Sequence, residues 1–177
     1  MVRLTTFAAL VLTASLLLVA GCYESKFALG PKGQAVFDRA YVGDWEAAAE
    51  QSKARIIIRN FNDKEYYVEW DTPDQKPLRM SGFLIDVKGA AFAHLRELTE
   101  DGTLPDKYLI VRVALADGKL SLRQLNDKFF DAKPIDSPEQ FRKLVEQNLD
   151  NDEMYDRDGS ICAVRIPPAA PPADGHS

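Results

Sequence analysis

Apolar and polar side chains alternate with a period of two residues in the middle of the chain. Tyr66, Val68 and Trp70 alternate with Glu65, Tyr67, Glu69 and Asp71, which is typical of a strand with one buried face. A β-branched run precedes them at residues 56–58, and an Asn-Asp pair lies between at residues 62–63. The pattern predicts a β-hairpin.

A second hairpin is predicted over residues 109–122. Apolar side chains recur at alternate positions on both sides of Asp117-Gly118: Leu109, Val111, Val113, Leu115, Leu120 and Leu122. Asp-Gly supplies the positive φ angles that a two-residue turn between antiparallel strands needs. We therefore expect these side chains to share one face of a sheet.

Three more segments have strand character, at residues 83–87, 91–95 and 161–166. Several short strands joined by turn residues favour an antiparallel sheet that is closed or nearly closed on itself. The predicted fold class is mainly β, a β-barrel or a curved antiparallel sheet, with about seven strands before one C-terminal α-helix that packs on it.

That helix follows Ser137, a residue that can cap it. Pro138 suits the first turn, and Gln140 completes a capping box. Apolar residues then follow at helical spacing: Phe141, Leu144, Val145 and Leu149. A shorter helical turn is expected around residues 36–41.

Both ends of the chain differ from this middle part. Residues 1–21 have a basic start at Arg3, an apolar run and small residues before a cysteine, which is signal-peptide architecture. Residues 22–34 are polar and contain Gly and Pro, so they are expected to be a tether. Residues 167–177 are rich in Pro and Ala and are expected to be a disordered tail.

Composition agrees with one folded domain over residues 35–166. The chain has 177 residues, 46% of them hydrophobic and 28% charged, as in ordinary globular proteins. The net charge is -5, and Lys and Arg form no dense run. The sequence therefore gives no indication of a nucleic-acid partner or of a polybasic membrane patch.

The apolar run ends in Leu18-Val19-Ala20-Gly21-Cys22. This segment resembles the lipobox of bacterial lipoproteins. The resemblance implies a diacylglyceryl thioether on Cys22, cleavage of the Gly21–Cys22 bond by the lipoprotein signal peptidase, and acylation of the new amine. Two or three acyl chains make a stable membrane anchor, whereas one gives only marginal binding. The expected membrane attachment is the lipid on Cys22.

Tyr23 follows the cysteine, where many lipoproteins that stay in the inner membrane carry Asp. The resemblance therefore implies the outer membrane, with the domain facing the periplasm.

Gly43-Asp44-Trp45 resembles the G-x-W signature of lipocalin-like barrels. In that family the tryptophan closes the barrel floor beneath a basic side chain from a late strand. The resemblance implies this role for Trp45, with Arg123 or Arg165 as the basic side chain. The alternative is an ordinary core tryptophan.

Cys162 and an acidic cluster are the remaining candidate functional residues, and each also has an ordinary structural interpretation. Cys162 is expected to point inward with Val164 as a free buried thiol, and a catalytic pair with His94 is the alternative.

An acidic cluster follows the helix: Asp150, Asp152, Glu153, Asp156 and Asp158. Its spacing fails the EF-hand pattern, so a solvated loop is expected and no metal site is assigned.

These patterns favour a lipid-anchored binding module with no catalytic residues and no cofactor. Its partner is expected to be a small apolar ligand inside the barrel or another envelope protein. The alternatives are an accessory lipoprotein of a larger envelope complex and a cysteine-dependent enzyme. Aromatic residues in the strands are compatible with a hollow barrel or with a filled one.

Overall fold

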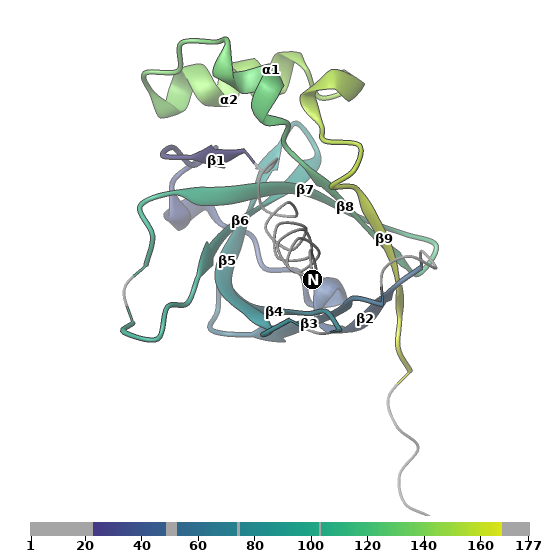
Figure 1. The fold of residues 1–177 in the computed structure, drawn as a ribbon. Helices are drawn as coiled ribbons and strands as arrows, with labels where there is room; N and C mark the ends of the chain where they lie inside the picture. Colours follow the sequence, from purple (N-terminus) through teal and green to yellow (C-terminus); the bar gives the residue numbers. More distant parts are fainter. Residues whose placement is uncertain (1–22, 49–52, 74, 103, 168–177) are drawn as a thin grey trace, which may run out of the picture.

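The computed structural model describes residues 23–48, 53–73, 75–102 and 104–167. Their strands form one antiparallel sheet, in which eight strands close into a barrel (Figure 1). The barrel strands are β2 (Gly43–Ala47), β3 (Arg55–Asn60), β4 (Tyr66–Asp71), β5 (Leu78–Val87), β6 (Ala90–Glu97), β7 (Tyr108–Ala116), β8 (Lys119–Gln124) and β9 (Ile161–Arg165). Strands β2 to β8 form a meander, and β9 closes it by pairing with both β8 and β2. The mainly β fold predicted from the sequence is confirmed.

Both predicted hairpins are present. In the first, β3 and β4 pair with Ile56 opposite Trp70, and residues 61–65 connect them. In the second, Asp117 and Gly118 have φ angles of 53° and 72°, as a two-residue turn of the primed type requires. Strands β7 and β8 are therefore held in a fixed register on either side of this turn.

One hydrophobic core fills the barrel. Its fully or nearly fully buried side chains come from all eight barrel strands: Trp45, Ile56, Ile58, Tyr66, Val68, Met80, Leu84, Ala93, Val111, Val113, Leu120 and Ala163. The alternating apolar residues of the two hairpins supply much of this core. The period of two therefore identified the inner faces of β4, β7 and β8.

A second core lies outside the barrel, against the outer faces of β5, β6 and β7. Helices α1 (Asp127–Asp131) and α2 (Pro138–Gln147) cover it (Figure 1). Its buried members come from the outer faces of strands, from the helices and from connecting segments: Phe83, Ile85, Val87, Phe92, Ile110, Leu125, Phe130, Phe141, Val145 and Tyr155. Both faces of β5 are thus buried.

Helix α2 starts as its sequence predicts. The Ser137 hydroxyl accepts a hydrogen bond from the Gln140 N–H at 3.2 Å. The Gln140 side chain accepts one from the Asp136 N–H at 2.9 Å, one residue before the usual capping-box donor. Phe141 and Val145 point into the second core and are fully buried, so this face fixes the helix to the barrel.

The segment that follows Cys22 differs from the expected tether over residues 22–34. The Tyr23 ring stacks on Phe130 with centroids 4.5 Å apart, and Leu29 is fully buried. Strand β1 (Glu24–Ser25) pairs with the start of β7. Apolar side chains in this segment complete the second core, so the folded unit begins no later than Tyr23.

Short 3-10 turns complete the described structure: η1 (Lys32–Gln34), η2 (Arg39–Tyr41) and η3 (Asp152–Met154). The second lies within the helical turn expected around residues 36–41. None of the helices among the described residues is long and apolar enough to span a membrane. The signal segment with Gly21 and Cys22, and the tail from residue 168, lie outside the described residues.

Candidate functional site

Trp45 and Arg165 meet at one end of the barrel. Trp45 is fully buried, and the guanidinium carbon of Arg165 lies 4.2 Å from the centre of its ring. Arg165 also donates a hydrogen bond to the backbone oxygen of Val42 at 2.8 Å, and the Trp45 Nε1–H donates one to the oxygen of Tyr41 at 3.0 Å. A cation over an indole face is a favourable arrangement, so this contact ties β9 to the start of β2.

Gly43 leaves the space for this contact. A Cβ atom at position 43 would lie 2.3 Å from Nη1 of Arg165, closer than any non-bonded contact allows. Of the two arginines considered from the sequence, Arg165 therefore lies over Trp45. Arg123 does not, because it lies on the outer face of β8, over the Tyr155 ring.

The barrel interior contains little space. Its cavity has a volume of about 40 Å³ and is lined by apolar side chains that include Ile58, Val68, Leu120 and Val113. Sites for small organic ligands usually have volumes of about 300–1,000 Å³. Among the described residues, the inward-pointing side chains themselves fill the barrel.

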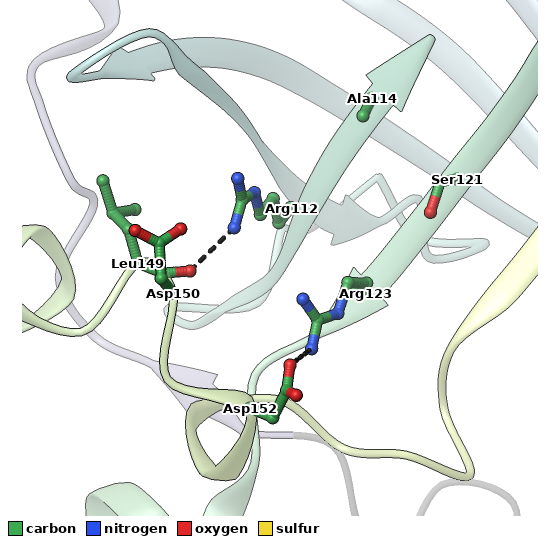
Figure 2. Close-up of a pocket in the computed structure, with 7 residues that line it drawn as sticks. All are labelled: Arg112, Ala114, Ser121, Arg123, Leu149, Asp150 and Asp152. Atoms are coloured by element: carbon green, nitrogen blue, oxygen red, sulfur yellow. Dashed lines mark hydrogen bonds and ion pairs between the residues drawn. The ribbon is translucent and has the colours of Figure 1, made fainter. Parts of the chain in front are cut away.

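A larger hollow lies on the outside of the barrel, beside β7 and β8. It has a volume of about 380 Å³. Its floor and walls come from two strands and from the loop that follows α2: Arg112, Ala114, Ser121, Arg123, Leu149, Asp150 and Asp152 (Figure 2). We call this hollow the outer pocket.

Two cross-strand pairs form the sheet side of the outer pocket. Ala114 lies opposite Ser121, and Arg112 lies opposite Arg123. The small Ala and Ser side chains leave the hollow open. Like charges directly opposite each other in a sheet are destabilising, so the arginine pair needs compensating contacts.

Tyr155 supplies much of this compensation. Its ring is buried, and the guanidinium carbons of Arg123 and Arg112 lie 3.9 and 5.7 Å from the ring centre. The Tyr155 hydroxyl accepts a hydrogen bond from Nη1 of Arg112 at 3.1 Å and donates one to the Leu149 oxygen at 2.9 Å. Burial raises the pKa of Tyr155, although the hydrogen bond from Arg112 opposes this, so the hydroxyl stays protonated at neutral pH.

The two sides of the outer pocket carry opposite charge. Arg112 and Arg123 extend from the sheet, whereas Asp150 and Asp152 extend from the loop (Figure 2). Arg123 donates to Asp152 at 2.7 Å. Arg112 donates to the backbone oxygen of Leu149 at 2.7 Å, but among the described residues neither Arg112 nor Asp150 takes part in an ion pair.

Cys162 does not point inward, so that part of the sequence interpretation is wrong. Its side chain is exposed, whereas Ala163 is fully buried and packs into the barrel. The reason is the period of two along β9. Because Arg165 faces Trp45, Ala163 shares its face, and Cys162 and Val164 point outward.

His94 is fully buried, with no exposed surface. It lies in the second core on the outer face of β6, where its ring stacks on Phe83 with centroids 5.0 Å apart. Cys162 lies on β9, and strands β7 and β8 separate β9 from β6. The structure therefore does not bring Cys162 and His94 together.

The acidic residues after α2 lie mainly at the surface, in the loop and in η3. Asp150, Asp152 and Glu153 are exposed. Within the described part of the chain, no group of three or more His, Cys, Asp or Glu side chains is arranged to hold a metal ion. Two of these acids, Asp150 and Asp152, instead line the outer pocket.

The sequence interpretation missed the outer pocket, although one signal for it was available. In a hairpin with a two-residue turn at 117–118, residue 112 must lie opposite residue 123. That register predicts the Arg112–Arg123 pair. It does not predict Tyr155 or the aspartates, which reach the pair from a loop more distant in the sequence.

Comparisons with protein-family models, with curated proteins and with solved structures give no match for this chain.

Proposed function

We propose that this chain is a lipid-anchored lipoprotein of the bacterial envelope whose barrel domain binds a small charged ligand in the outer pocket. The observation that carries the binding role is the Arg112–Arg123 pair beside a hollow of about 380 Å³. Two arginines placed opposite each other cost stability, and a ligand with negative charge offsets that cost.

A small apolar ligand inside the barrel receives less support. The interior cavity of about 40 Å³ is far smaller than the about 300–1,000 Å³ usual for small-molecule sites. A protein partner in the envelope is the second interpretation from the sequence. Closure of the barrel pairs the edges of β2 and β9, which leaves fewer strand edges for such a partner.

The lipid anchor rests on the lipobox sequence before Cys22. The structure adds one consequence, since Tyr23 already packs against Phe130 and Phe141. If Cys22 carries the lipid, only one peptide unit separates the anchor from the folded domain. The domain would then lie close to the membrane, which we propose to be the outer membrane because Asp does not follow the cysteine.

The anchor is tested by a Cys22→Ser substitution, with Cys162→Ser as the matched control. We expect Cys22→Ser to abolish the lipid mass and membrane retention, and Cys162→Ser to leave both unchanged. Membrane fractionation and intact mass spectrometry measure the two properties. A Cys22→Ser protein that is still cleaved and membrane-bound would contradict the lipoprotein assignment.

The binding role is tested by native mass spectrometry of the detergent-extracted full-length protein. We expect a retained small ligand that is lost when both pocket arginines are replaced in an Arg112→Met, Arg123→Met double variant. Arg157→Met, at an exposed arginine outside the pocket lining, is the control. Equal ligand retention in all three proteins, or a retained protein partner in place of a ligand, would contradict the proposal.

A further inference from the structure

The two sides of the outer pocket carry formal charges that are equal in size and opposite in sign. The sheet side carries Arg112 and Arg123, and the loop side carries Asp150 and Asp152. A ligand with only negative charge would approach two carboxylates, and a ligand with only positive charge would approach two guanidinium groups. Either would meet repulsion from one side of the pocket.

On each side, one charged residue has no ionic partner within the described part of the chain. Arg112 is half-buried, donates to described residues through Nη1 alone, and has no carboxylate within ion-pair distance among them. Asp150 is exposed on the loop and forms no ion pair within the described chain. Its carboxylate faces the Arg112 guanidinium in Figure 2, so the two groups are positioned on either side of one space.

The Arg123–Asp152 contact differs from this pair. Arg123 stacks on Tyr155 and donates to Asp152, so its guanidinium is held in place. The exposed fractions of the two side chains are 32% and 76%, which leaves the Asp152 carboxylate open to solvent. This pair thus forms one wall, and the side chains of Arg112 and Asp150 are left to recognise a ligand.

From this geometry we infer that the outer pocket binds a small zwitterion, an amino acid or short peptide with a free amino group and a free carboxylate. The inference depends on the proposed binding function. The ligand carboxylate accepts from the Nε and Nη2 hydrogens of Arg112, which can form a bidentate contact. The ligand ammonium donates to Asp150, supported by the negative charge of Asp152.

The floor of the pocket suits the remainder of such a ligand. Ala114 and Ser121 provide a shallow surface of small side chains. The Ser121 hydroxyl can donate to a ligand carbonyl or accept from its amide, and Leu149 offers an apolar contact for a small side chain. A volume of about 380 Å³ lies within the range usual for small-molecule sites.

The test uses alanine, dialanine and trialanine, in which the distance between the two charges increases stepwise. Each is titrated against the detergent-solubilised full-length protein by isothermal calorimetry. We expect one member of the series to bind best. Its N-acetyl form, which lacks the positive charge, and its C-terminal amide, which lacks the negative charge, should each bind about tenfold or more weakly, because a charged hydrogen bond is lost.

Protein variants assign the contacts. Asp150→Asn should weaken binding of the free peptide and leave its N-acetyl form nearly unaffected, because only the free form has the ammonium group. Asp158→Asn, at an exposed aspartate outside the pocket lining, is the matched control. Since Asp150 makes no ion pair with described residues, this substitution should not impair folding, which thermal unfolding checks.

Three results overturn the inference. Binding of the N-acetyl form as tightly as the free peptide would indicate a simple anion site, and the proposed function would stand without the zwitterion. Equal effects of Asp150→Asn and Asp158→Asn would remove the role of the loop. Absence of binding by the whole series would exclude this ligand class. The proposed function fails on a different result, namely equal ligand retention by the double arginine variant or a retained protein partner in place of a ligand.

Discussion

The Nε2 atom of His94 accepts a hydrogen bond from the backbone N–H of Leu29 at 2.9 Å. Both residues are fully buried in the second core. Because Nε2 accepts, the imidazole is neutral and carries its proton on Nδ1. This bond fixes the N-terminal segment to the outer face of β6, and protonation of Nε2 would set two donors against each other.

Stability should therefore fall in mildly acidic solution. Burial lowers the pKa of His94 from 6.5 to about 4, and the nearby backbone groups of Phe92 and Phe83 oppose the shift only in part. Between these two values the unfolded chain binds more protons than the folded one, so the free energy of unfolding decreases as the pH falls. We expect a loss of about 3 kcal/mol between pH 7 and pH 4, measured by denaturant unfolding.

His94→Gln is the control, because glutamine can accept the Leu29 hydrogen bond and does not titrate. Carboxylates contribute mainly at lower pH. One example is Asp44, whose pKa is lowered because its hydrogen bonds to Arg59 and Arg55 outweigh the effect of burial. The comparison is thus cleanest between pH 6.5 and 5. An unchanged pH slope in His94→Gln would contradict the prediction.

Gly43→Ala should destabilise the protein through Arg165. The new methyl group would lie 2.3 Å from Nη1 of Arg165, so the guanidinium must leave the Trp45 face. Overpacking of this kind costs about 1–3 kcal/mol. The free energy of unfolding of Gly43→Ala, measured in denaturant, gives this cost directly.

A double-mutant cycle provides the control for this prediction. In an Arg165→Ala background the guanidinium is absent, so Gly43→Ala should cost less. The cost that remains comes from the backbone of residue 43, whose φ of 158° is strained for a residue with a Cβ atom. Equal costs in the two backgrounds would mean that backbone conformation at position 43, and not Arg165, decides the effect.

The sequence predicted the inner core better than the outer one, for a physical reason. Where a strand has its buried residues mainly on one face, as in β4 and β8, the alternation directly reports which side chains point inward. In β5 both faces are buried, so Phe83 and Leu84 are both core residues on opposite sides. Periodicity cannot predict which segment covers the second face, so the sequence predicts a tether where Tyr23 in fact packs into the second core.

Cys162 should react rapidly with a thiol reagent in the folded protein, because its side chain is exposed. If Cys22 carries the proposed thioether, labelling without denaturant should reach one thiol per chain. Cys162→Ser should reduce labelling to zero. Two reactive thiols in the membrane-extracted protein, counted by intact mass spectrometry, would contradict lipidation of Cys22.

Phe141→Ala should loosen α2 from the barrel. The side chain is fully buried and its ring lies edge-on to Phe130 at a centroid distance of 5.7 Å. Loss of a buried phenylalanine usually costs about 3–5 kcal/mol. Lys143→Ala, at an exposed position of the same helix, should change the free energy of unfolding by less than about 0.5 kcal/mol. Similar losses in the two variants would contradict the packing role of Phe141.

Tyr155 should stabilise the arginine pair by two separable contacts. Tyr155→Phe keeps the ring beneath Arg123 but removes the hydroxyl that bonds Arg112 and Leu149, which should cost about 1 kcal/mol. Tyr155→Leu also removes the ring and should therefore cost more stability than Tyr155→Phe. In an Arg123→Gln background this difference should be smaller by about 0.5–1 kcal/mol, because the cation–π contact is already absent. Denaturant unfolding of the variants measures these differences. If the difference between Tyr155→Leu and Tyr155→Phe is the same with and without Arg123, the ring acts only by packing in the core.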